Sequence, residues 1–223
     1  MVAAPPRQVQ TLPTVLLTGF DPFGGEEVNP SWLAVQALQG RRISAHRVVT
    51  AQLPTVFGAA LNQLQGLLRQ HRPVLVICVG QAGGRAALSM ERVAINLDDA
   101  RIADNAAAQP VDTPVVPGGP AAYFTTLPVK AMLLALQRKG FVAEVSQTAG
   151  TFVCNHVFYG LMHTLATRRG FRHVRGGFIH VPWLPEQGSP SMPLQDMVSG
   201  LRLAVRVALM TKQDIVVAAG QTS

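Results

Sequence analysis

One cysteine stands where a thiol could act as a nucleophile. Cys154 follows an apolar, strand-like run over residues 141–145 and a turn of small residues over 148–151. Behind it, apolar residues recur every three or four positions from Val153 to Leu165, as on one face of an amphipathic helix. Unpaired backbone N–H groups and the positive end of the helix dipole favour a thiolate in a first helical turn. We therefore expect an ionised, nucleophilic thiol; the alternative is a small buried hydrophobe, as most free cysteines are.

The second cysteine, Cys78, has a sequence context that predicts no catalytic role. Cys78 lies within a continuous apolar run over residues 74–79, typical of a central strand, so we expect a structural role. Two cysteines in such settings do not make a disulfide framework, which favours a reducing compartment and a cytoplasmic protein. Residues 1–10 also lack the apolar core of a signal peptide.

A cysteine nucleophile needs a base, and His180 is the histidine best placed to be one. It ends an apolar strand-like run over residues 175–182, on the edge of the sheet where we expect Cys154. The alternative is a core histidine with a satisfied hydrogen bond. His156 would point ~200° away from Cys154 on a helix. The remaining histidines fall on polar or basic stretches: His46, His71, His163 and His173.

Several carboxylates could orient the base. Glu91 abuts an apolar run over residues 92–97, where a buried carboxylate is costly unless it is paired. Asp98 and Asp99 end that run and could instead pair with Arg101. These acidic residues have no histidine or cysteine at a metal-ligand spacing, so we expect no metal. The full set of candidates is Asp21, Glu91, Asp98, Asp99, Asp104 and Glu186.

The elements that must position these groups alternate between strand and helix. The pattern predicts a single α/β domain over residues 14–215, with a mostly parallel twisted sheet and helices on both faces. We expect residues 1–13 to be a disordered extension, residues 216–223 a tail, and residues 98–120 a covering loop. Sites in such sheets form beyond the carboxyl ends of strands. Four loops should therefore meet at one edge: 20–25, 80–85, 148–154 and 180–187. The predicted strands are 15–18, 47–53, 74–79, 92–97, 141–145 and 175–182, and the predicted helices begin near residues 29, 54, 128, 153 and 192.

Charge and hydropathy exclude two classes of partner. The net charge of +7 comes mostly from arginine, but the chain has no long basic run and no interleaving of basic and aromatic residues. We therefore expect no nucleic-acid binding. No run approaches the roughly 18 apolar residues that a membrane span requires, so we expect no membrane association.

Two loops could shape a binding pocket. Residues 80–84 match neither the dinucleotide fingerprint nor the phosphate loop with its lysine, and indicate a close-approach turn lining a pocket. Phe20 and Phe23 flank Asp21 and Pro22, and could pack as a plug or grip a flat ligand.

Four segments together resemble pyroglutamyl peptidase I, the pyrrolidone-carboxylate cysteine peptidases. They are residues 19–25 (GFDPFGG), 91–96 (ERVAIN), 150–155 (GTFVCN) and 178–182 (FIHVP). The resemblance runs from about residue 15 to residue 210, in order and at matching spacing. Asp21 departs from it, since glutamate is more usual there.

This resemblance implies a Cys-His-Glu triad formed by Glu91, Cys154 and His180. Arg101 and the backbone N–H of Cys154 would stabilise the oxyanion. The residues that would bind a pyroglutamyl ring are Phe20, Phe23, Gln81, Phe152 and Val153. It also implies a cytosolic omega peptidase that removes N-terminal pyroglutamate through a thioester acyl-enzyme, needs no cofactor and forms homotetramers.

Two other interpretations stay open at this stage. The chain could be a non-catalytic α/β module that binds a small cyclic amide, or a related amidohydrolase with a different substrate.

Overall fold

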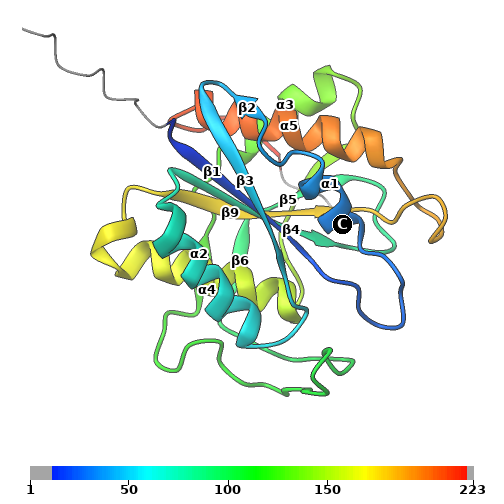
Figure 1. Ribbon diagram of the computed structural model, residues 1–223, viewed down its shortest axis with the longest axis vertical. Helices are drawn as coiled ribbons and strands as arrows, with labels where there is room; N and C mark the ends of the chain where they lie inside the picture. The colour runs from blue at the N-terminus through cyan, green and yellow to red at the C-terminus, as the bar shows by residue number, and fades with distance from the viewer. Residues whose placement is uncertain (1–11, 220–223) are drawn as a thin grey trace, which may run out of the picture.

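The computed structural model describes residues 12–219, which form a twisted sheet with helices on both faces (Figure 1). Within that range the main sheet has seven strands in the order β2-β3-β1-β4-β9-β5-β8. These are β1 (Thr14–Phe20), β2 (Arg42–Ile43), β3 (His46–Leu53), β4 (Leu75–Gln81), β5 (Leu88–Glu91), β8 (Ala143–Ser146) and β9 (Arg175–Val181). A two-stranded sheet joins β6 (Val93–Ile95) and β7 (Ala122–Phe124). The helices are α1 (Pro30–Gln36), α2 (Ala59–His71), α3 (Val129–Arg138), α4 (Val153–Thr167), the 3₁₀ turn η1 (Arg169–Phe171) and α5 (Leu194–Met210).

The predicted fold class is confirmed, with one error in strand direction. Strands β3, β1, β4 and β9 are parallel neighbours, as expected. However, β5 runs antiparallel to β9, and β8 runs parallel to β5. The prediction that four loops follow carboxyl ends at one edge is therefore wrong for residues 148–154, because the strand before them points the opposite way. Of the four loops, those after β1, β4 and β9 follow carboxyl ends at that edge, and residues 148–154 reach the 80–85 loop where Arg85 Nη2 donates to the Thr148 carbonyl at 3.1 Å.

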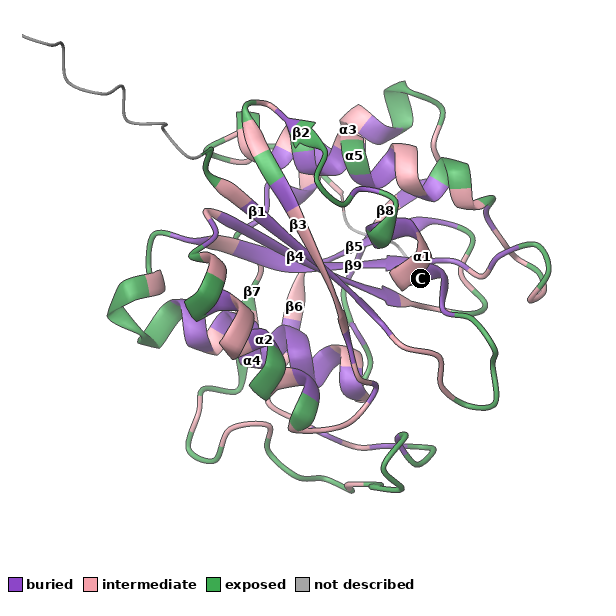
Figure 2. Cartoon of the chain, in the orientation of Figure 1, coloured by how far each residue is buried: buried purple, intermediate pink, exposed green. Residues whose placement is uncertain are grey.

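The sheet separates two apolar cores. Helices α1, α3 and α5 cover one face, and α2 and α4 cover the other (Figure 1). Successive strand residues point to opposite faces, so Leu17 packs into the α5 core and Leu16 into the α4 core. The central strands are buried along nearly their whole length (Figure 2). Such burial on both sides explains why these strands are continuous apolar runs.

Two other predicted elements differ in their bounds, and one strand was not predicted. The predicted strand over residues 92–97 is present but shorter, as β6, and it pairs with β7 outside the main sheet, because β5 has already ended at Glu91. The second helix begins at Ala59, not residue 54, because side chains of neighbouring loops bind the backbone of residues 55 and 57. The two-residue strand β2 was not predicted at all; it forms a hairpin with β3.

The long loop between β6 and β7 has no helix and is fixed at several points. Asp98 pairs with Thr113 as an isolated bridge, and Asp104 accepts a hydrogen bond from the backbone of Phe57 at 2.8 Å. The expected extension over residues 1–13 and tail over 216–223 fall mostly outside the described residues. No helix between residues 12 and 219 is long and apolar enough to cross a membrane.

Candidate active site

The predicted catalytic side chains lie on one face of the sheet. Met90, Val145 and Ile179 point into the α5 core. Because strand residues alternate, their successors Glu91, Ser146 and His180 point to the α4 face. Strands β5, β8 and β9 therefore bring polar groups together beneath the start of α4. The site is built on the face of the sheet rather than beyond its edge.

Glu91 and His180 form the buried pair that the sequence predicts. His180 Nδ1 lies 2.7 Å from Glu91 Oε1, and the two side chains are 5% and 0% exposed. With Nδ1–H donating to the carboxylate, Nε2 is the ring nitrogen that can accept a proton. The ring of Phe178 packs against the imidazole, with centroids 4.8 Å apart. The pair thus holds the imidazole in one orientation and one tautomer.

Arg85 completes this pair, and the sequence analysis did not identify it. Its Nη1 lies 2.7 Å from Glu91 Oε1 and 3.4 Å from Ser146 Oγ, and its Nη2 donates to the Thr148 carbonyl at 3.1 Å. Glu91 Oε1 therefore accepts from a guanidinium and an imidazole at once, while Oε2 is buried without a partner among the described residues. An arginine closing a glycine-rich turn six residues before a buried glutamate was the signal that could have revealed it.

Cys154 is the second residue of α4 and sits directly over strand β4. A Cβ added at Gly80 would lie 2.8 Å from Cys154 Sγ and 2.8 Å from the Phe178 ring. Gly80 is also the cross-strand partner of His180. Only a glycine allows this approach, although Gly80 lies within β4 and not in the turn that was predicted over residues 80–84. The sulfur and the imidazole are thereby placed over neighbouring residues of adjacent strands.

The surroundings of the Cys154 thiol raise its pKa, whereas the sequence analysis expected the start of a helix to lower it. Burial, together with smaller effects of the nearby Glu91 carboxylate and Cys78, raises the pKa of Cys154 to about 12, against an opposing effect of Arg85. The thiol is half-buried at the surface of the α4 core. Desolvation and the negative charge of Glu91 thus raise the thiol pKa by more than the helix N-terminus lowers it. A thiol with a raised pKa needs a base to take its proton before it can act as a nucleophile.

The residues after Cys154 anchor the first turn of α4. Asn155 accepts from the backbone N–H of Ile95 and donates to the carbonyls of Ile95 and Leu97, at 2.9–3.0 Å. His156 Nδ1 lies 2.8 Å from Asp98 Oδ2, and its Nε2 accepts from the backbone of Gly58 at 3.1 Å. Asp98 therefore pairs with His156, not with Arg101 as the alternative suggested. As predicted, His156 is turned away from the nucleophile.

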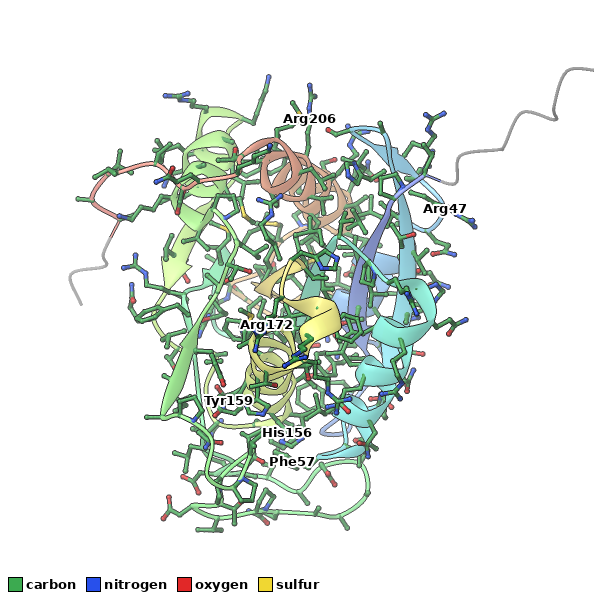
Figure 3. The ribbon with its side chains drawn as sticks, turned by 90° about the vertical axis from the view of Figure 1, so that its left-hand side faces the viewer. Arg47, Phe57, His156, Tyr159, Arg172 and Arg206 are labelled. Atoms are coloured by element: carbon green, nitrogen blue, oxygen red, sulfur yellow. The ribbon has the colours of Figure 1, made fainter. Side chains whose placement is uncertain are left out.

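The expected ring-binding residues divide into two groups. Phe23 and Phe152 are partly exposed and pack together, with ring centroids 5.9 Å apart. Phe57, which was not predicted, stands edge-on to Phe152 at 5.4 Å and also to His156 (Figure 3). Phe20 and Val153 are buried core residues. Only the first group leaves side-chain surface for a ligand.

Two predicted polar residues have different surroundings. Gln81, at the end of β4, has a buried Oε1 with no hydrogen-bond partner among residues 12–219. Arg101 is exposed. It follows Asp99, whose backbone exchanges hydrogen bonds with Thr151 at 3.0 Å and 2.7 Å, so its segment is bound to the turn before α4. No group of three or more potential metal ligands gathers within residues 12–219.

Comparison with known proteins assigns residues 13–211 to one protein family. The family model for pyroglutamyl peptidase matches residues 13–211. The pyrrolidone-carboxylate peptidase of Cupriavidus taiwanensis is 61% identical over 215 residues, covering 94% of this chain and 99% of that protein. The corresponding protein of Bacillus cytotoxicus is 52% identical over 214 residues, with the same coverage.

Solved structures agree with the sequence comparison. Pyroglutamyl peptidase I from Bacillus amyloliquefaciens superposes with a TM-score of 0.90 at 48% identity, covering 93% of this chain and all of that one. A variant of the pyrrolidone carboxyl peptidase of Pyrococcus furiosus gives 0.85 at 41% identity, with coverage of 88% and 98%. With its fold, its sequence and the predicted motifs all in agreement, the chain belongs to the pyroglutamyl peptidase family of cysteine peptidases.

Proposed function

We propose that this enzyme removes N-terminal pyroglutamate from peptides through a thioester on Cys154. The single observation that carries the mechanism is the alignment of Glu91, His180 and Cys154 on one face of the sheet. This arrangement supplies a nucleophile, a base and an orienting carboxylate from three separate elements, which is what acyl transfer requires.

Acylation begins with removal of the thiol proton. Because burial keeps the pKa of Cys154 near 12, His180 Nε2 takes the proton as the sulfur attacks the pyroglutamyl carbonyl. The tetrahedral oxyanion accepts from the backbone N–H of Cys154, a donor left free in the first helical turn, and from Arg101. His180 then gives its proton to the departing amine, which leaves a thioester on the sulfur.

Deacylation reverses the roles. Water enters where the amine left, His180 Nε2 takes its proton, and the hydroxide attacks the thioester carbonyl. The collapse of the second tetrahedral intermediate returns the proton to the sulfur and releases pyroglutamate. Glu91 stabilises the imidazolium in both halves, and Arg85 holds Glu91 in place.

The pyrrolidone ring lies against Phe23 and Phe152. A flat, uncharged lactam suits two aromatic faces. Its ring N–H is a donor, and Gln81 Oε1 is a buried acceptor without a partner, so pairing the two removes a desolvation cost. Phe20 and Val153 are buried in the core and do not contribute to this surface. Proline lacks the ring carbonyl and presents a charged amine, so a prolyl peptide should be rejected.

The expected setting of the enzyme completes this proposal. We place it in the cytoplasm, supported by two cysteines that are both free. We also propose a homotetramer that works without a cofactor, as the resemblance to the family implies. Light scattering after size-exclusion chromatography should then give four times the chain mass of 23.8 kDa.

A fluorogenic assay tests the proposed reaction. Wild-type enzyme should release aminomethylcoumarin from its pyroglutamyl amide and not from its prolyl amide. Cys154→Ser should lose activity by more than about 1,000-fold while keeping the wild-type circular dichroism spectrum. His180→Ala and Glu91→Gln should lower kcat far more than they raise KM, since both act in the chemical step.

The contrary results are clear. A wild-type enzyme that releases no coumarin from the pyroglutamyl amide refutes the peptidase. A Cys154→Ser variant that retains the rate refutes the assigned nucleophile, and unchanged kcat in the His180 and Glu91 variants refutes the triad.

A further inference from the structure

A basic cleft lies on the other side of the sheet from Cys154. It is a cavity of about 630 Å³ between α5, the β2 hairpin and the turn that joins α3 to β8. On α5 its lining residues recur at positions 199, 202, 203 and 206, which form one face of a helix. The lining residues are Arg42, Ile43, Ser44, Lys139, Phe141, Ser199, Arg202, Leu203 and Arg206. None of them belongs to the proposed active site.

Figure 3 makes the separation plain. Arg206 lies on α5 at one end of the molecule, whereas Phe57 and His156 lie near the opposite end, beside the long loop. His156 is only two residues from Cys154, so the cleft is remote from the nucleophile.

The cleft gathers positive charge without neutralising it. Four of its nine lining residues are cations: Arg42, Lys139, Arg202 and Arg206. An adjoining cavity of about 410 Å³ shares Arg42, Ser199 and Arg202, and adds Arg41. No acidic residue lines either cavity, and within residues 12–219 none of the five cations lies within 4.0 Å of a carboxylate in an ion pair. Converging like charges repel one another, and a bound anion would relieve that repulsion.

The side chains around the cations indicate the class of anion. Guanidinium groups match phosphate oxygens in a bidentate geometry, and the hydroxyls of Ser44 and Ser199 can donate to the same oxygens. Ile43, Phe141 and Leu203 give the cavity an apolar wall. Its volume falls within the range of ordinary small-molecule sites. Several phosphates together with a flat ring would use both parts of this surface.

We propose that this cleft binds a compound with two or more linked phosphates, and that nucleoside triphosphates fit it best. The phosphates contact Arg42, Arg202 and Arg206, and the base packs on Phe141. The four cations are exposed side chains that line one cavity of limited volume, which suits a compact polyphosphate better than an extended nucleic acid.

Calorimetric titration of the intact enzyme at 50 mM salt tests this proposal with three probes. ATP and inorganic tripolyphosphate should both bind, and adenosine should not. The double variant Arg202→Gln/Arg206→Gln should weaken ATP binding by about tenfold, since each exposed charge contact contributes a few-fold. Phe141→Ala should weaken ATP by about tenfold and leave tripolyphosphate unchanged, because only ATP has a base to stack.

Matched controls keep the test specific. Arg172 is an exposed arginine outside both cavities, and Arg172→Gln should leave ATP binding unchanged (Figure 3). All variants should hydrolyse the pyroglutamyl amide at the wild-type rate, which shows that they are folded.

Three results would overturn the proposal. The first is no binding of ATP or tripolyphosphate at 1 mM. The second is equal weakening by Arg172→Gln and by the double variant. The third is a twelve-nucleotide single-stranded RNA that binds more tightly than ATP and displaces it, which would make the cleft a nucleic-acid site.

Discussion

Replacing Gly80 with alanine should displace the nucleophile without altering any group that takes part in the chemistry. The new methyl group would lie 2.8 Å from Cys154 Sγ, and 2.8 Å and 2.9 Å from two carbons of the Phe178 ring. Ordinary van der Waals contact begins at 3.4 Å, so the sulfur and the ring must each retreat by at least 3.4 − 2.8 = 0.6 Å. Phe178 in turn packs on His180, so both ends of the proton transfer are disturbed.

The size of the effect follows from this displacement. A misplacement of about 1 Å at a reacting centre can cost about 100-fold in rate, so a shift of 0.6 Å or more should lower kcat by about 10- to 100-fold. Overpacking a core costs about 1–3 kcal/mol, or about 3–9 °C in Tm for a chain of this size. The loss in kcat should therefore appear in a protein that remains folded at 25 °C.

A second glycine on the same face gives the matched control. A Cβ at Gly176 would lie 2.7 Å from Leu165 Cδ1 and 3.3 Å from Leu161 Cδ2, in the same α4 core but away from the sulfur. Gly176→Ala should lower Tm by a similar amount and keep the wild-type kcat. Steady-state kinetics with the pyroglutamyl coumarin amide and a thermal melt of each variant make the comparison.

If the Gly80→Ala enzyme keeps more than half of the wild-type kcat, the proposed dependence of catalysis on the close approach of Gly80 to Cys154 Sγ is refuted. It would also be refuted if Gly176→Ala lost as much activity as Gly80→Ala, because the effect would then come from general overpacking.

Four further substitutions test other parts of the structure. Arg85→Gln should lower kcat by about tenfold with KM within twofold, because Glu91 keeps one of its two partners and Arg85 is 29% exposed; unchanged kcat would show that the ion pair is dispensable. Arg101→Gln should lower kcat by about 100-fold if Arg101 is the oxyanion donor, and an unaltered rate would exclude that role. His156→Ala leaves the Asp98 carboxylate buried and unpaired, so Tm should fall by about 10 °C, and a wild-type melt would contradict this reasoning. Burial raises the pKa of Cys78 from 9.0 to about 12, so between these pH values the unfolded chain releases a proton that the native chain retains, and the free energy of unfolding should decline as pH rises. In urea titrations between pH 9 and 11, the free energy of unfolding of Cys78→Ala should decline less steeply than that of the wild type. An identical slope would show that Cys78 is not the source of the decline.

Local patterns were sufficient to predict the elements that carry two of the proposed catalytic residues. Cys154 was predicted from a strand, a small-residue turn and a helical apolar stripe, and α4 begins at Val153. His180 was predicted at the end of an apolar strand, and it lies on β9. Each of these inferences depended on residues within a few positions of one another. Glu91 could be singled out only as one of several carboxylates until the family resemblance was considered.

What depended on distant contacts could not be predicted. The direction of β8 is fixed by its pairing with β5, and no local pattern shows which way a strand runs in a sheet. The pKa of Cys154 is raised by burial and by Glu91, a residue 63 positions earlier (154 − 91 = 63). A prediction based only on the start of the helix therefore gave the wrong direction for this pKa. Asn155 was missed because its partners come from another segment, whereas Arg85 was missed although its partner Glu91 follows only six residues later.

The anchors of the long loop bear on how the enzyme could be re-engineered. Asp98 is joined to α4 through His156, and Asp104 and Asn105 are joined to residues 55–57 and the loop after β1. These hydrogen bonds hold the loop in one position, so we expect it to stay in place and not to open and close. Residues 111–114 of this loop are exposed, and the bridge from Thr113 to Asp98 is the contact that holds them. Sequence grafted there should leave the side-chain contacts of Asp98 and Asp104, and with them the first turn of α4, undisturbed.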